Sequence, residues 1–113
     1  MTPIDIQLPP GAVIANYLYP AMTLADLTQD ILTVHLPNGY YIDVGWYPEH
    51  DPKGRYVIRV FREHWDQQKL DTPIMTRDQH QVRYFVESLA VRFSQPMITG
   101  SNTAATKMCM NRV

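Results

Sequence analysis

The sequence predicts a two-layer α+β domain in which one long helix packs across a small antiparallel sheet. Residues 31–62 alternate apolar and polar side chains in three stretches, which is typical of an antiparallel meander. Residues 77–94 instead repeat apolar side chains at the spacing of a helix. Because an apolar helix stripe and an apolar sheet face bury each other, these two stretches are expected to form one core.

The first hairpin of the meander decides which strand residues face the helix. A two-residue turn at Asn38-Gly39 would place Asp43 among apolar side chains, which is costly. A three-residue loop over residues 37–39 keeps Asp43 on the other face and puts glycine at the position that needs a positive φ. We therefore predict the longer loop, with Val34 opposite Ile42.

This register divides the strand residues into an inner face toward the helix and an outer face. The predicted core joins the inner face to the helix stripe and consists of Leu32, Val34, Leu36, Ile42, Val44, Trp46, Ile58, Val60, Val82, Phe85, Val86, Leu89 and Phe93. The outer face carries Thr33, His35, Tyr41, Asp43, Tyr47, Val57, Arg59 and Phe61. Opposite pairs on the outer face are Asp43 with Arg59, an expected ion pair, and Tyr41 with Phe61.

The N-terminal third of the chain gives weaker signals. Alternating apolar residues predict a short edge strand at 4–8, and helical spacing favours a helical turn or an extended arm at 12–19. Thr23 and Asp26 resemble a capping box, which predicts a short helix at 24–29. These segments are expected to cover parts of the sheet.

After the meander, short strands are expected at residues 73–75 and 97–99. Thr76 with Gln79 three residues later forms a capping box, so Thr76 is the predicted N-cap of the long helix. Gly45 lies inside a predicted strand, which indicates a bulge or the close approach of another backbone.

Composition narrows the class of protein. The 113 residues carry a formal net charge of −1, which argues against a nucleic-acid binder that works by bulk charge. The chain has one cysteine, Cys109, and neither a signal-peptide pattern nor an apolar run of membrane-spanning length, so a cytoplasmic protein is expected. We expect one domain at residues 1–99 and a flexible tail at 100–113.

Motifs that would indicate an enzyme or a cofactor are missing from the sequence. There is no phosphate-binding glycine loop, nucleophile elbow, paired-cysteine motif or zinc-protease motif. Glu49, His50 and Asp51 are suitable metal ligands, but their spacing matches no standard site. We therefore expect neither a metal nor another cofactor.

The outer sheet face is the most promising place for function. The candidate binding residues are His35, Tyr41, Asp43, Tyr47, Arg59 and Phe61, with Trp65 as a further anchor. Three aromatic side chains on one face exceed what solubility needs, which favours a contact surface. The alternative is that the N-terminal arm covers this face and makes it a second core.

The leading hypothesis is a non-enzymatic protein that binds a protein partner or a second copy of itself, with an inhibitor of another protein as a narrower variant. The alternative is a small-molecule binder or an enzyme that uses His35, Asp43 and Arg59. Single-stranded nucleic acid could in principle stack on Tyr41, Tyr47 and Phe61, but the acidic neighbours make this the weakest hypothesis.

Overall fold

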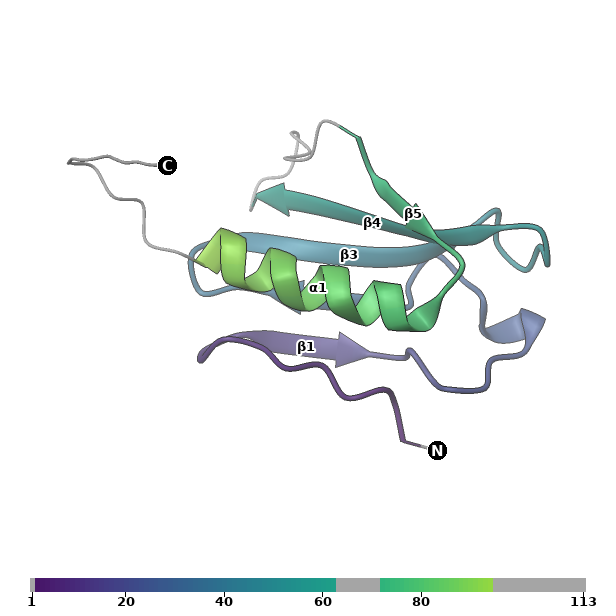
Figure 1. Ribbon diagram of the computed structural model, residues 1–113, viewed down its shortest axis with the longest axis horizontal. Helices are drawn as coiled ribbons and strands as arrows, with labels where there is room; N and C mark the ends of the chain where they lie inside the picture. The colour runs from purple at the N-terminus through teal and green to yellow at the C-terminus, as the bar shows by residue number, and fades with distance from the viewer. Residues whose placement is uncertain (1, 63–71, 95–113) are drawn as a thin grey trace.

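A computed structural model describes residues 2–62 and 72–94 of the chain, and it confirms the α+β fold with one helix packed on an antiparallel meander (Figure 1). Among these residues the sheet has five strands in sequence order. The elements are β1 (Val13–Asn16), the short 3₁₀ helix η1 (Leu24–Asp26), β2 (Leu32–His35), β3 (Tyr40–Tyr47), β4 (Arg55–Arg62), β5 (Ile74–Thr76) and α1 (Gln79–Ser94).

The register of the central strands is the predicted one. The Leu36 N–H donates to the Tyr40 carbonyl at 2.8 Å, which closes the three-residue loop. Gly39 has a φ of 91°, a conformation that glycine adopts without strain. Ile42 pairs with Val34 on one side and with Val60 on the other. The hairpin therefore keeps Asp43 off the inner face, as its sequence required.

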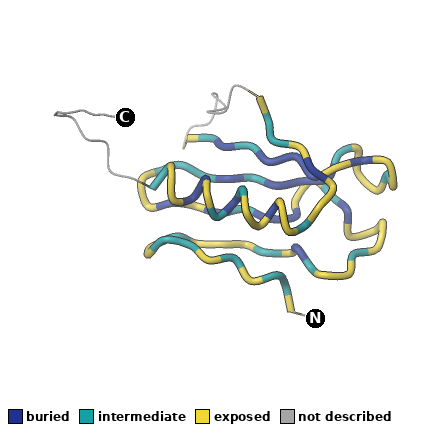
Figure 2. The backbone as a smooth tube through the Cα atoms, viewed as in Figure 1, coloured by how far each residue is buried: buried dark blue, intermediate teal, exposed yellow. Residues whose placement is uncertain are grey.

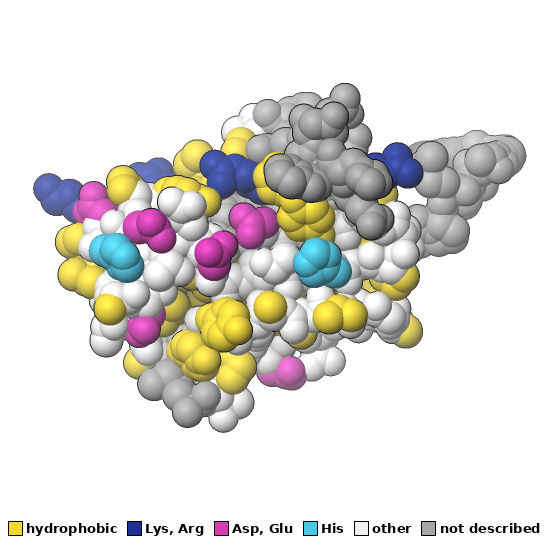
Figure 3. Space-filling model, turned by 180° about the vertical axis from the view of Figure 1, so that it is seen from behind, with side chains coloured by type: hydrophobic (Ala, Val, Ile, Leu, Met, Phe, Trp, Pro, Cys, Tyr) yellow, Lys and Arg dark blue, Asp and Glu magenta, His cyan; other side chains and the backbone are white. Residues whose placement is uncertain are grey.

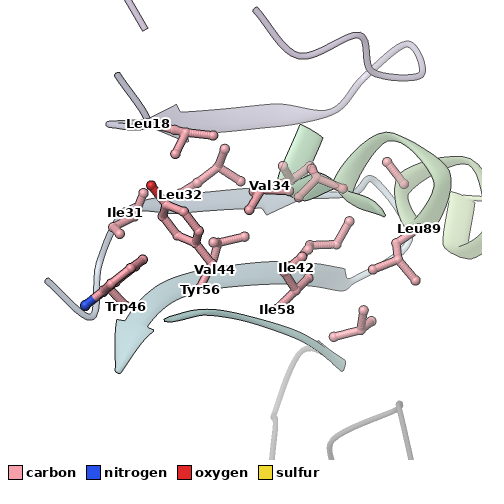
Figure 4. Close-up of a cluster of buried hydrophobic side chains, with 14 of the residues drawn as sticks. Leu18, Ile31, Leu32, Val34, Ile42, Val44, Trp46, Tyr56, Ile58 and Leu89 are labelled. Carbon is pink, nitrogen blue, oxygen red and sulfur yellow. The ribbon is translucent and has the colours of Figure 1, made fainter. Parts of the chain in front are cut away.

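The core lies between the sheet and α1, where side chains from both layers meet (Figure 4). The buried stretches of the chain concentrate in the central strands and on one side of the helix (Figure 2). All predicted core residues are buried except Phe85 and Phe93, which are half-buried at the margin of the helix. Leu18 and Leu27, from loops before the meander, also belong to the core, as do Ile31, Tyr56 and Ala90, none of which the predicted core included.

The edge strand predicted at residues 4–8 was wrong, and so was the helical turn at 12–19, for which an extended arm was the alternative. Residues 13–16 form the edge strand β1, because Val13 and Ile14 are β-branched and the edge of β2 offers backbone partners. Residues 4–8 form an arm whose apolar side chains pack against the core. The Gln7 N–H donates to Glu87 of α1 at 2.8 Å, so the arm lies on the helix side of the sheet (Figure 1).

The short helix predicted at 24–29 is a single 3₁₀ turn, η1. The Asp26 carboxylate accepts hydrogen bonds from the Thr23 N–H at 2.9 Å and from the Thr23 hydroxyl at 3.0 Å. The turn ends early because the following residues bond to β3 instead: the Trp46 N–H donates to the Thr28 carbonyl at 2.8 Å.

Helix α1 begins two residues later than predicted, and its N-cap is Asp78 rather than Thr76. The Asp78 carbonyl accepts the first helical bond from Val82 at 3.1 Å, and its side chain accepts from the His80 N–H at 2.8 Å. Thr76 belongs to β5, where pairing with Tyr56 holds it extended. The strand predicted at 73–75 is thus present, shifted by one residue.

Gly45 is the site of a close backbone approach, as its place in a strand predicted. The Thr28 carbonyl and the Ile31 N–H bond to β3 on either side of Gly45, which leaves Gln29 and Asp30 as a bulge between them. A Cβ atom at Gly45 would collide with the Gln29 carbonyl group. Since alternate residues of β3 point to opposite faces, this bulge lies over the outer face.

The strand predicted at 97–99, the tail at 100–113 and Trp65 lie outside the described residues. Within residues 2–62 and 72–94, no helix is long and apolar enough to cross a membrane.

Candidate functional site

The outer face of the sheet is the candidate site, and Figure 3 views the molecule from this side. Residues 4–8 lie on the opposite side with α1, and residues 13–16 lie in the sheet as β1, so the alternative in which an N-terminal arm covers this face was wrong. Large apolar side chains extend the face at both edges of the sheet. Val13 of β1, 66% exposed, lies opposite His35, and Met75 of β5, 53% exposed, lies opposite Val57.

Three rings from neighbouring strands stack along one row of this face. The rings of His35 and Tyr41 have centroids 5.4 Å apart, and those of Tyr41 and Phe61 are 5.3 Å apart. Each pair follows from the predicted register, which places the residues directly opposite one another. We call His35, Tyr41 and Phe61 the aromatic row. The row presents a flat, partly exposed surface, and the imidazole ring of His35 forms its end on β2.

Arg59 does not form the expected ion pair with Asp43, although the two residues are opposite each other. Its guanidinium instead lies 5.1 Å from the centroid of the Tyr47 ring. Among the described residues, the one salt bridge is Arg83–Glu87 on the helix. Neighbouring opposite charges on the outer face are therefore not joined to each other.

Asp43 lies in an environment that disfavours its charge. Partial burial raises the pKa of the Asp43 carboxyl above its ordinary value, and the negative charge of Asp30 in the bulge adds to the rise. The positive charge of Arg59 and hydrogen bonding from Thr33 act in the opposite direction without cancelling it. Burial, with a smaller effect of Asp43, also raises the pKa of the neighbouring Tyr41.

The raised pKa of Asp43 predicts how its replacement changes stability with pH. A carboxyl with a higher pKa in the folded state favours folding below its ordinary pKa and loses that stabilisation as the pH rises through the raised value. Asp43→Asn, which stays neutral, should therefore increase the free energy of unfolding at neutral pH and give no such gain in acid. Urea denaturation of dilute protein at several pH values measures this, with Asp5→Asn as the control for removing one negative charge. A variant that is less stable at neutral pH would contradict the expected sign.

A groove of about 530 Å³ opens beside Arg59, within the range of known ligand sites. It is lined by Tyr47, Pro48, Lys53, Arg55, Val57, Arg59 and Met75. Of the described residues, the lining takes three cationic side chains and no carboxylate, over an apolar floor in which Val57 is buried. We call this the cationic groove. Its chemistry suits an anionic group attached to an apolar or aromatic one.

The side of the face nearer β1 carries the opposite charge. The bulge brings Asp30 close enough to act on Asp43, and the Glu49 carboxylate accepts a hydrogen bond from the Gln29 N–H of the bulge at 2.9 Å. Acidic side chains accordingly gather on this face in Figure 3. We call Asp30, Asp43 and Glu49 the acidic patch. The outer face is thus divided into an acidic part over β2 and β3 and a cationic part over β4 and β5.

The residues proposed for acid–base chemistry do not converge. The ring of His35 stacks on Tyr41, the guanidinium of Arg59 lies over Tyr47, and Asp43 takes its hydrogen bonding from Thr33. A histidine that acts as a general base must lie within hydrogen-bond reach of the carboxylate that orients it. His35 and Asp43 instead have different partners, so they do not form such a pair.

The side chains at the tip of the β3–β4 hairpin have structural partners. The His50 Nδ1 atom lies 2.8 Å from the Leu24 carbonyl, and Asp51 accepts from the Lys53 N–H at 2.8 Å. No three potential metal-ligating side chains of residues 2–62 and 72–94 come together as a site. The hairpin tip therefore holds loops in place rather than presenting free ligands.

Sequence reasoning missed most of the groove. Arg55 could have been found, because strand alternation puts it on the same face as Arg59 and opposite Tyr47. Met75 could not, because its position depends on the register between β5 and β4, which no turn or residue pattern predicts. Lys53 comes from a loop whose path follows from tertiary contacts.

Comparison with protein-family models, with curated proteins and with solved structures found no match to this chain.

Proposed function

We propose that this protein is a non-enzymatic interaction module that binds another protein chain through the outer face of its sheet. The observation that carries the proposal is the aromatic row, a stacked surface on the side of the sheet opposite the helix. Exposed Val13 lies opposite His35 and extends the row at the β1 edge, and exposed Met75 adds a separate apolar side chain opposite Val57. Contiguous apolar patches with a charged surround are typical of protein interfaces.

The charges around the row favour a protein over a nucleic acid as the partner. A polyanionic strand would cross the acidic patch to reach the cationic groove, and the chain as a whole carries a net charge of −1. A protein surface can match both charges locally. The single cysteine leads us to place this interaction in a reducing compartment such as the cytoplasm.

The test removes the aromatic row without touching the core. A Tyr41→Ser, Phe61→Ser double variant should remain folded, since it loses two stacked pairs worth about 0.5–1.5 kcal/mol each beyond their area burial, and neither ring belongs to the core. Affinity capture from the native extract should retain a stoichiometric partner on the wild type, or a second copy of this chain, and lose it with the variant. The interaction must then be rebuilt from the purified partner, with affinity reduced at least tenfold by the double variant.

Tyr84→Ser is the matched control, because Tyr84 is 65% exposed on α1 away from this face. It should bind as the wild type does. The proposal fails if purified partner binds the double variant and the wild type equally, or if Tyr84→Ser is the variant that loses it. It also fails if neither a second chain nor self-association is found.

A further inference from the structure

We propose that the occupant of the outer face is a second copy of this chain, packed face to face about a two-fold axis that runs between β3 and β4, parallel to the strands. This inference rests on the proposed function and names its partner. It follows from the register of β3 and β4 and from the distribution of charge on the face.

The two-fold operation explains which residues would meet. An axis between β3 and β4 in the plane of the interface lays β3 of one copy over β4 of the other at the same level along the strands. Each outer residue of β3 and β4 then faces the second copy's version of its own register partner. Asp43 meets Arg59 of the second copy, and Tyr41 meets Phe61 of the second copy. Every such contact occurs twice.

The charges of the face suit this arrangement. Within one copy Arg59 lies over Tyr47, and among the described residues it forms no salt bridge with Asp43, so the two charges can instead pair between copies. The same operation places the acidic patch of one copy on the cationic groove of the other. A near-neutral net charge of −1 opposes association only weakly.

Shape supports the same pairing. The bulge of Gln29 and Asp30 rises over Gly45 on the outer face. Gly45 is opposite Val57, which forms the floor of the cationic groove. The two-fold axis therefore sets the bulge of one copy above the groove of the other, and the Asp30 carboxylate enters among cationic side chains.

The size of the face predicts a small interface. About this axis β3 lies over β4 and β2 over β5, whereas β1 has no counterpart. These four strands, in chain order, hold 4, 8, 8 and 3 residues, and at about 4.8 Å by 3.3 Å a residue they cover roughly 360 Å² before side-chain relief and the bulge are counted. Since each partner buries roughly 800 Å² in a standard interface, we expect a weak dimer. Sheets packed face to face in this way form a sandwich with nearly aligned strands.

Charge exchange between two variants tests the axis. Asp43→Arg should be monomeric by light scattering at tens of micromolar, where the wild type is a dimer, because Arg59 would then face a second cation. Arg59→Asp should be monomeric for the matching reason. An equimolar mixture should regain the dimer mass. In the mixed dimer the new arginine at position 43 faces the new aspartate at position 59, and the unchanged Arg59 faces the unchanged Asp43. At least a tenfold gain in affinity over either variant alone is expected.

Arg92→Asp is the control, a like charge reversal on the exposed surface of α1, and it should dimerise as the wild type does. Circular dichroism verifies that every variant is folded, and recovery in the mixture excludes misfolding as the cause of dissociation. A monomeric wild type, a dimer that persists in Asp43→Arg, or a mixture that stays monomeric would each overturn the inference. If the wild type is monomeric but a different purified protein binds the aromatic row, the proposed function stands and this inference alone fails.

Discussion

Gly45→Val should destabilise the protein by about 3 kcal/mol or more, the upper part of the range for overpacked sites. The added Cβ would overlap the Gln29 carbonyl group, and it would lie 2.9 Å from the Tyr47 ring. A backbone carbonyl fixed by bonds on both sides of the bulge cannot turn away as a side chain could. The free energy of unfolding from urea denaturation measures the effect.

The matched control for Gly45→Val is Ala15→Val on β1. Ala15 is exposed on the same face, so a larger β-branched side chain there should be neutral or slightly stabilising. Gly45→Ala should already be destabilising, because the first carbon makes the collision. If Gly45→Val unfolds at the same urea concentration as the wild type, the bulge does not lie where we describe it.

Ile42→Ala is the second substitution with a large expected effect, a loss of about 2–5 kcal/mol in the free energy of unfolding. Ile42 is fully buried at the centre of the sheet, between Val34 and Val60. Truncation leaves a cavity that the two flanking strands are held too firmly to fill. Since domains of this size are stable by only about 5–15 kcal/mol, the variant should unfold at much lower urea concentration.

Ile14→Ala makes the same chemical change on the edge strand β1, where the side chain is 36% exposed. Its expected cost is under about 1 kcal/mol, as for a surface substitution. Equal losses in the two variants would contradict the placement of Ile42 at the centre of the core.

The parts of the fold that the sequence predicted were those in which local chemistry and burial agree. Residues 37–39 supply turn residues for one loop length, and the same loop keeps Asp43 out of the core. The stacked pair of Tyr41 and Phe61 follows from that register without further information. The helix stripe was equally clear, because its period extends over four turns.

Other elements could not be predicted because they depend on distant partners. Strand β1 forms where β2 offers an edge, and its residues taken alone have helical spacing. The N-cap of α1 moved from Thr76 to Asp78 because Thr76 is held in β5 by Tyr56. In the candidate site, the alternation of side chains along the strands predicted the aromatic row. The bulge and the cationic groove were not predicted, because they are formed by segments far apart in the sequence.

An isotope-filtered nuclear Overhauser experiment tests the central claim most directly. In a mixture of labelled and unlabelled wild-type protein, it records only contacts between different copies. We predict cross-peaks between Phe61 of the labelled copy and Tyr41 of the unlabelled one. Intermolecular cross-peaks confined to α1, or none from the outer face at a concentration where the protein is dimeric, would contradict the account.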